Sequence, residues 1–496
     1  MRTIITMFAL ALAMAGSVNA QEPPETLWDK TFGGAYGDRG YSLQQTSDDG
    51  FILWGQTSPS FFQFGGWLIR TDGDGNEIWN SVLSGGDAWA WGKSVQQTSD
   101  GGFILLGRYR DAGADDVWLT RTDRDGNQLW SNTFGESGII DEGCSVQQTS
   151  DGGFTLLGRT QSYGAGGWDF WLIRTDGDGN EIWNQTFGGS ESDNAMWGQQ
   201  TFDGGFILLG STASYGAGDA DFWLIRTDGD GNEFWNKTFG GSGRDEGISV
   251  QQTSDGGFIL LGRTQSYGAG LTDFWLVRTD SDGNERWNKS FGGSGEDYGR
   301  SVHQAPDGGF MLAGDTTSYG AGSADFWLIK TDSDGNEVWN KTFGGSGTEW
   351  AFSGQQTSDG GFAMLGSTTS YGAGMEDFWL IRTAGDGPPP CDLEVALSGY
   401  PEEVLRGDYL TFDAIVANTC DAPLAFDRAL MNITGPASLE KALYEGDPLP
   451  VVGSVAANLS LAVPPRAPLG AYTVEVTVFR DGEAIDADTF EVNVSG

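Results

Sequence analysis

Seven tryptophans recur along this chain at a nearly constant spacing of 51 to 53 residues. They are Trp28, Trp79, Trp130, Trp183, Trp235, Trp287 and Trp339. Six of them end the phrase T-D-x-D-G-N-[EQ]-x-W. A period of this length is typical of one supersecondary unit that is copied and stacked, because a single copy cannot bury its apolar face alone. The repeat is therefore the strongest constraint on the architecture.

One copy of the repeat predicts four short strands separated by tight turns. The runs 145–149, 154–158, 169–174 and 181–187 are rich in apolar, β-branched and aromatic residues, and S-D-G-G and D-G-D-G-N turns follow the first and the third. Glycines in such turns supply the positive φ angles that hairpins need. The copy has no helical periodicity. Four short strands per unit predict a blade of a β-propeller, and hence an all-β fold.

The number of copies predicts how the propeller closes. The strand W-L-[IVT]-[RK] occurs seven times, but the seventh copy runs into a proline-rich segment and lacks its own fourth strand. The N-terminal segment 26–32 has the pattern of a fourth strand without a blade. If this strand completes the last blade, seven four-stranded blades form a ring with no open edge. The competing architecture, an open solenoid, needs terminal capping units that the sequence does not show.

The periodic aromatic and basic residues are interpreted as structural. Fourteen of the 20 tryptophans occupy two strand positions, where large rings would fill the space between blades. One basic residue per copy is expected to pair with a carboxylate of a nearby turn. These residues are Arg70, Arg121, Arg174, Arg226, Arg278, Lys330 and Arg382.

The sequence texture changes after three consecutive prolines at 388–390. The tryptophan period stops, and alternating runs such as 409–416, 456–463 and 472–479 predict about seven strands. This pattern is typical of an immunoglobulin-like or fibronectin-like β-sandwich. The expected segments are a signal peptide at 1–20, the seven-bladed propeller at 21–386, a proline linker at 387–390 and the sandwich at 391–496.

The N-terminus and two cysteines indicate an exported protein. Arg2, an apolar run at 4–15 and the small-residue site that ends at Ala20 are typical of a secretory signal peptide. The run is too short to span a membrane comfortably, so we expect the mature chain in the periplasm or outside the cell. A disulfide between Cys391 and Cys420 fits that compartment, because an antiparallel strand pair would bring the two residues together.

The composition excludes several classes of function. Acids outnumber bases 69 to 27, and the resulting charge of −42 repels nucleic acid and anionic membranes. The single histidine, His303, argues against histidine-based triads, and it replaces a glutamine of the repeat, so we interpret it as structural. Cys144 is expected to be a free, unreactive thiol. A pair of catalytic carboxylates of the kind that glycosidases use is not excluded by the composition. We expect the protein to be a monomer.

Three phrases of the repeat resemble a known family. S-V-Q-Q-T-S-D-G-G-F-I-L-L-G, D-F-W-L-I-R-T-D and G-N-E-x-W-N-K-T-F-G-G-S are similar to a repeat of secreted and surface proteins in bacteria and archaea, akin to quinoprotein-like and Kelch-like propellers. The resemblance covers 26–384 and implies a β-propeller, usually with no assigned activity. The G-N-E-x-W phrase also resembles the tryptophan-docking motif of quinoproteins, which implies a quinone-dependent oxidoreductase as one alternative.

The T-D-x-D-G-N turns suggest a calcium site as an alternative to a plain hairpin turn. Their oxygens have the 1, 3, 5 spacing of a calcium loop, but the glycine and the final glutamate of an EF-hand are missing. We therefore favour the plain turn and keep calcium as the possible cofactor to be tested. The candidate ligands are Asp72, Asp74, Asn76, Asp176, Asp178, Asn180, Asp228, Asp230 and Asn232.

The strand connections predict where a ligand would bind. The one-to-two and three-to-four connections are short, so the longer loops gather on the opposite face of the propeller, called here the long-loop face. Exposed aromatic rings beside carboxylates suit stacking on sugars or a protein contact. The candidates are tryptophans that break the period, placed mostly in inter-blade loops, with the S-Y-G-A-G tyrosines and two aspartates: Trp89, Trp91, Trp168, Trp197, Trp350, Tyr163, Tyr215, Tyr267, Tyr319, Tyr371, Asp245 and Asp297.

These features favour an exported, non-catalytic binding or scaffold protein that holds carbohydrate or a surface protein on the long-loop face. The alternatives are a carboxylate-based glycoside hydrolase and a quinoprotein-like oxidoreductase. A catalytic pair of carboxylates would have to break the repeat, because acids that recur in every copy fit turn chemistry.

Overall fold

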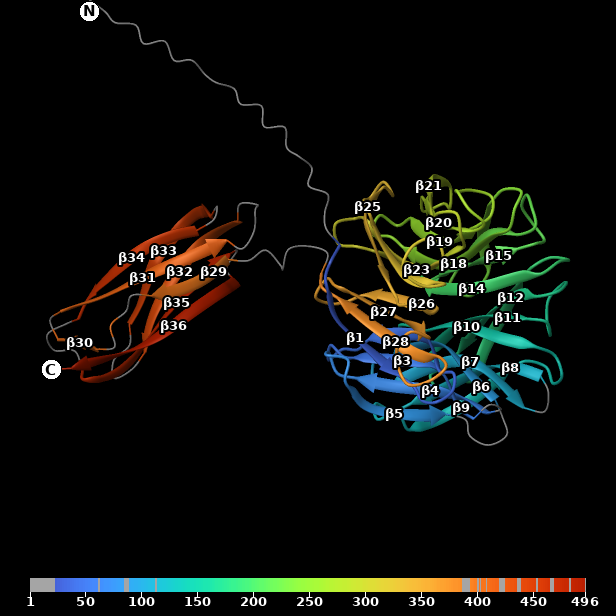
Figure 1. The fold of residues 1–496 in the computed structure, drawn as a ribbon, viewed down its shortest axis with the longest axis horizontal. Helices are drawn as coiled ribbons and strands as arrows, with labels where there is room; N and C mark the ends of the chain where they lie inside the picture. The colour runs from blue at the N-terminus through green and yellow to red at the C-terminus, as the bar shows by residue number, and fades with distance from the viewer. Residues whose placement is uncertain are drawn as a thin grey trace, which may run out of the picture. The chain divides into compact units, whose positions relative to one another are not determined.

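The computed structural model divides the chain into two compact units, Met1–Asp386 and Gly387–Gly496 (Figure 1). In the first unit the structure describes residues 23–60, 63–83, 89–111 and 114–385. In the second it describes 393–398, 401, 403–406, 408–418, 424–434, 439–451, 454–463, 468–480 and 483–495. The predicted signal peptide, the proline linker and the Cys391–Cys420 disulfide lie outside the described residues. Within the described ranges, no helix is long and apolar enough to cross a membrane.

The first unit consists of seven four-stranded antiparallel sheets, as the repeat predicts. We call them blades one to seven in chain order. The innermost strands are β2 (Arg39–Gln45), β6 (Trp89–Gln97), β10 (Asp141–Gln148), β14 (Asp193–Gln200), β18 (Asp245–Gln252), β22 (Asp297–Gln304) and β26 (Glu349–Gln356). The second strands are β3 (Phe51–Ser60), β7 (Phe103–Asp111), β11 (Phe154–Thr160), β15 (Phe206–Thr212), β19 (Phe258–Thr264), β23 (Phe310–Thr316) and β27 (Phe362–Thr368).

The outer half of each blade contains the two strands that carry the periodic tryptophans. The third strands are β4 (Gln63–Thr71), β8 (Ala114–Thr122), β12 (Asp169–Thr175), β16 (Asp221–Thr227), β20 (Asp273–Thr279), β24 (Asp325–Thr331) and β28 (Asp377–Thr383). The outermost strands are β5 (Glu77–Leu83), β9 (Gln128–Phe134), β13 (Glu181–Phe187), β17 (Glu233–Phe239), β21 (Glu285–Phe291), β25 (Glu337–Phe343) and β1 (Thr26–Phe32).

The N-terminal strand closes the ring, as predicted. β1 pairs antiparallel with β28 of blade seven, and Trp379 Nε1 donates to Asp29 Oδ2 at 3.0 Å. The innermost strands of the first and last blades are also joined, because the Gln45 N–H donates to Gln355 Oε1 at 2.8 Å. The last blade therefore has four strands like the others, with the edge of β28 paired to β1, and Figure 1 shows its strands beside those of blade one.

The periodic tryptophans pack between blades, which confirms their structural interpretation. Trp223 on β16 meets Phe170 of the preceding blade edge-on, with ring centroids 5.0 Å apart. Trp183 on β13 meets Phe206 of the following blade at 6.2 Å. Such edge-to-face pairs add to the apolar area that each ring buries. The ladder of tryptophans therefore stabilises the ring of blades.

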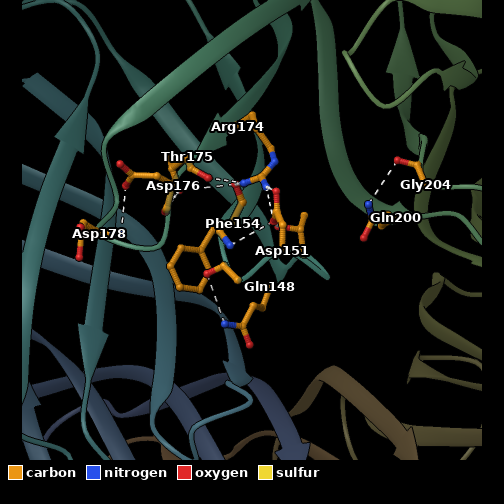
Figure 2. Close-up of polar contacts among 12 residues, drawn as sticks. Gln148, Asp151, Phe154, Arg174, Thr175, Asp176, Asp178, Gln200 and Gly204 are labelled. Carbon is orange, nitrogen blue, oxygen red and sulfur yellow. Dashed lines mark hydrogen bonds and ion pairs between the residues drawn. The ribbon is translucent and has the colours of Figure 1, made fainter.

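In each blade, a buried basic residue anchors the short turn on the face opposite to the long-loop face. Arg174 donates to the carbonyl of Phe154 at 3.1 Å and forms an ion pair with Asp151 (Figure 2). The predicted pairing with turn carboxylates is thus confirmed. The partners of the seven basic residues, in chain order, are Asp48, Asp100, Asp151, Asp203, Asp255, Asp307 and Asp359.

The second unit is a β-sandwich, as predicted, with eight strands in its described residues where about seven were expected. Leu410, Phe412, Val474 and Val476 are buried in it, and Tyr472 donates to the carbonyl of Pro468, a contact typical of immunoglobulin-like folds. One sheet contains β29 (Leu393–Ser398), β31 (Tyr409–Asn418) and β34 (Ser454–Ala462). The other contains β30 (Glu403–Leu405), β36 (Glu483–Ser495), β35 (Gly470–Arg480), β32 (Leu424–Thr434) and β33 (Leu439–Val451).

Candidate functional site

The first two blades depart from the repeat on the long-loop face. Both lack the S-Y-G-A-G loop, and their second and third strands are longer than those of the other blades. A pocket of about 520 Å³ lies at this place. Blade one contributes Arg39, Tyr41 and Phe64, and blade two contributes Trp91 and Lys93. Arg108 of blade two, with Met375 and Glu376 of blade seven, completes this side of the wall.

Aromatic rings form one wall of the pocket. Phe64 stacks against Trp91 with centroids 6.2 Å apart and 25° between the ring planes. Trp89 meets Phe64 at 5.3 Å and Trp91 at 5.7 Å. The structure thus brings two of the predicted ligand residues, Trp89 and Trp91, together with a ring that sequence reasoning missed.

The prediction that four of the tryptophans lie in inter-blade loops was wrong. Trp89 and Trp91 lie on β6, Trp197 lies on β14 and Trp350 lies on β26. Each innermost strand contains a β-bulge, which interrupts the alternation that marks a strand. The strands therefore begin before the bulge, earlier than the sequence suggests. The tryptophans therefore belong to the rigid inner wall of the propeller.

The bulge also brings one variable residue per blade to the central channel. The register shifts between Gly92 and Ser94, so Lys93 is the extra residue of blade two. The same position carries a different side chain in every blade: Tyr41, Lys93, Cys144, Met196, Ile248, Arg300 and Phe352. The strand ends in two glutamines in six of the seven blades, whereas the position two residues before the bulge varies as well: Arg39, Trp91, Glu142, Asn194, Glu246, Tyr298 and Trp350. The variation between copies is therefore concentrated in the first half of the innermost strands.

Arginines and carboxylates form a network beside the pocket. Arg108 Nη1 lies 2.6 Å from Glu142 Oε1 and 3.5 Å from Asp115 Oδ2. Both carboxylates have a second arginine partner. Arg159 Nη2 lies 2.6 Å from Glu142 Oε2, and Arg110 Nε lies 2.6 Å from Asp115 Oδ1. The guanidinium of Arg108 also lies 4.3 Å from the Trp91 ring centroid. These pairs hold the aromatic wall in place, since cation–π contacts favour a fixed ring.

Lys93 and Cys144 lie next to this network. Burial lowers the pKa of Lys93, and its ammonium lies 5.0 Å from the ring centroid of Tyr41. Cys144 is a free cysteine, as expected. Its thiol donates to the Ala195 carbonyl at 3.2 Å, and burial raises its pKa to about 11. The group is therefore a thiol at neutral pH, which argues against a nucleophile.

The inner strands enclose a second cavity of about 350 Å³ along the central channel. Trp197 lines it and is 39% exposed. His303 also lines it, with Nε2 2.7 Å from the Gly354 carbonyl, and burial lowers the pKa of the ring. Glutamines at the same repeat position accept backbone N–H groups of the next blade, as Gln96 does from Gln148. His303 thus joins two blades as those glutamines do, in line with its structural interpretation.

The five S-Y-G-A-G tyrosines support the long loops. Tyr215 donates to the Gly188 carbonyl at 3.1 Å, and its ring lies 5.4 Å from Trp223. The five rings remain 38 to 48% exposed. Tyr163, Tyr267, Tyr319 and Tyr371 make the same ring contact in their blades. Trp168 lies in such a loop, 4.6 Å from Arg159.

Asp245 and Asp297, the two aspartates among the predicted ligand residues, do not lie at the surface beside these rings. Both are fully buried. Asp245 accepts from Ser266 Oγ at 2.6 Å and from the Gly241 N–H at 2.9 Å, and Asp297 makes the equivalent contacts. Each carboxylate is used to order the loops around it, so neither reaches the surface.

The D-x-D-G-N turns are held by their own hydrogen bonds. Asp176 Oδ1 accepts the N–H group of Asp178 at 2.9 Å (Figure 2). The same oxygen accepts the N–H group of Asn180 at 2.9 Å, and Oδ2 accepts Asn180 Nδ2 at 3.0 Å. The described residues contain no group of three or more His, Cys, Asp or Glu that could hold a metal ion. Calcium binding stays a prediction to be tested. The same contacts occur within Asp72, Asp74 and Asn76, and within Asp228, Asp230 and Asn232.

Comparison with known proteins identifies no family. No family model matches the chain, and no curated protein matches it. Among solved structures, the plexin A4 extracellular region is 8% identical, with 93% of this chain and 62% of that chain covered and a TM-score of 0.42. A Synechocystis apocarotenoid oxygenase is 12% identical over 89% and 98%, with a TM-score of 0.38.

A β-glucosidase from Listeria innocua also resembles part of the chain. It is 18% identical over 22% of this chain, with a TM-score of 0.15. The matched part spans 17% of the length of the β-glucosidase.

Proposed function

We propose that this protein is an exported, non-catalytic binding protein that holds a carbohydrate in the pocket between blades one and two. The observation that carries the proposal is the position of the pocket, which forms where the repeat is broken. Structural residues recur in every blade, whereas Phe64, Trp91 and Lys93 have no counterparts of the same type in most blades. Residues that serve a ligand are expected to differ from the repeat in this way.

The chemistry of the pocket suits a sugar. The Trp91 and Phe64 rings offer faces on which a pyranose can stack, and the side chains of Gln56, Ser58 and Tyr41 can exchange hydrogen bonds with hydroxyl groups. The mouth is concave and of the size that small ligands occupy. The ion pairs of Arg108 hold one wall rigid, which reduces the ordering cost of binding.

The pocket supports binding better than hydrolysis. Glu376 is the one carboxylate among the described residues that line it, and its Oε2 lies 2.7 Å from Arg39 Nε. Most glycosidases need two carboxyl groups that flank the scissile bond. A protein segment is the other candidate occupant, since aromatic and arginine side chains also dominate protein contacts.

A glycan array tests this proposal. The wild-type protein should bind at least one class of glycan, and Trp91→Ala should abolish the signal because it removes the stacking ring. Trp350→Ala is the matched control, since Trp350 has the same place in the repeat but does not line the pocket. No binding by the folded wild-type protein, or equal binding by Trp91→Ala, would refute the proposal.

A further inference from the structure

The charge of the pocket is opposite to that of the molecule. The chain carries a formal charge of −42. The described residues that line the pocket nevertheless include three cations, Arg39, Lys93 and Arg108, against the single carboxylate Glu376. A cationic cleft in an anionic protein concentrates anions at that place.

Comparison between blades explains how the excess of positive charge arises. In blades three and five, a glutamate of the innermost strand faces an arginine of the second strand, as in the cross-strand pair of Glu142 and Arg159. In blade two, Trp91 takes the place of that glutamate, and it faces Arg108. Arg108 therefore shares the glutamate of the next blade. Blade two has kept the arginine and replaced its own counter-ion with an aromatic ring.

Lys93 adds a second cation to the same blade. In blade six, the equivalent residue Arg300 pairs with buried Asp315 of the second strand at 3.1 Å. In blade two, Arg108 occupies the position of Asp315 on the second strand. The neighbour of Lys93 at that position is therefore a cation, whereas the neighbour of Arg300 is a carboxylate. Among the described residues, no carboxylate lies within ion-pair distance of the Lys93 ammonium, whose recorded contact is with the Tyr41 ring.

We propose that the pocket binds an acidic carbohydrate, with the carboxylate or sulfate of the sugar beside Lys93 and its ring stacked on Trp91. This proposal rests on the proposed carbohydrate function and specifies its ligand class. The cations Lys93, Arg108, Arg110 and Arg159 share the carboxylates Asp115 and Glu142, and an anionic ligand supplies missing negative charge. Burial lowers the pKa of Lys93 because it separates the ammonium from water, and a charge-assisted hydrogen bond to an anionic ligand would offset that penalty.

The experiment compares neutral, uronic-acid and sulfated glycans on one array, followed by titration of the best binder. Lys93→Gln should weaken acidic binding about tenfold or more, because it removes one charge-assisted contact. The matched control is Lys289→Gln, on the outermost strand of blade five. A salt titration of the wild-type protein needs no variant, and raising NaCl from about 50 to about 500 mM should weaken binding.

The outcomes separate this inference from the function on which it rests. Preference for acidic glycans that is lost in Lys93→Gln and reduced by salt supports both. Trp91-dependent binding of neutral glycans alone, or acidic binding that neither Lys93→Gln nor salt changes, overturns the anionic ligand and leaves the carbohydrate function standing. No binding of any glycan overturns both.

Discussion

At the scale of single residues, burial and hydrogen bonding distinguish the charges that build the propeller from those that could serve a ligand. Arg174 is 7% exposed and bonds two backbone carbonyls and Asp151, and this set recurs in blades one, two, four and five. Lys93 occurs once and has no such set. The contacts within its own blade therefore explain Arg174 as a structural residue, whereas Lys93 has no such explanation.

Replacing the repeated arginine should destabilise the protein. Arg174→Met leaves the Phe154 carbonyl without this buried donor, and we expect a loss of about 1–3 kcal/mol in the free energy of unfolding. Chemical denaturation measures it. Arg124→Met, in an exposed turn, is the control and should change stability by less than about 0.5 kcal/mol. Equal effects of the two substitutions would contradict the structural role of Arg174.

The buried carboxyl of Asp315 should make stability depend on pH. Burial raises its pKa to about 6 despite the opposing pull of Arg300. A folded-state pKa above the unfolded value of 3.8 means that its contribution is present below about pH 4 and is lost as pH rises through about 6. The melting temperature of the wild-type protein should therefore fall, relative to that of Asp315→Asn, between pH 4 and pH 7. Parallel profiles would show that Asp315 does not titrate there.

At more acidic pH, stability should depend on the aspartates of the short turns, whose pKa values are lowered; Asp100 is one of them. A hydrogen bond from Thr98, opposed by partial burial and supported by Arg121, lowers the pKa of Asp100 to about 2. Its contribution is present above the model-peptide value of 3.8 and is lost as pH falls towards 2. Because this window lies below that of Asp315, the two effects can be measured separately.

At the scale of elements, ring closure by β1 is the feature that the sequence predicts best and that stability should reveal most directly. Deletion of residues 21–32 removes β1 and exposes the edge of β28. We expect a lower melting temperature and concentration-dependent association, because a free strand edge pairs with other chains. Calorimetry and size-exclusion chromatography measure the two effects. Deletion of 21–23 alone, which leaves β1 intact, should show neither.

The D-x-D-G-N turns should not need a metal to fold. Asp176 uses both carboxylate oxygens within its own turn, and Asn76 Oδ1 accepts from Lys30 Nζ at 3.2 Å. We therefore expect the same melting temperature in calcium and in EDTA. A clear drop in EDTA, reversed by added calcium, would revive the calcium site, since ligand binding to the folded state raises stability.

The sequence predicted the strands and their closure because the alternation, the turns and the copy number all agree. It failed at the innermost strands, where the sequence begins the first strand of blade three at 145 but β10 begins at Asp141. The bulge at Cys144 and the flanking Gly143 interrupt the alternation there. Trp89 and Trp91 were consequently placed in a loop.

At the scale of the whole propeller, the copies differ mainly around the long-loop mouth of the channel. The pocket itself was missed because its walls come from blades one, two and seven, which are far apart in sequence. A signal was nevertheless present. Aligning the seven copies shows Trp91 where two other blades carry Glu142 and Glu246, and Lys93 at the bulge.

The most direct test of this account is isothermal titration calorimetry of the full chain with the glycan that binds best on the array. A ligand site between blades one and two predicts measurable binding to the wild-type protein, binding weakened at least about tenfold in Trp91→Ala, and unchanged affinity in Trp350→Ala. Wild-type affinity in Trp91→Ala, with the variant shown to be folded by its melting temperature, would contradict a ligand site between blades one and two.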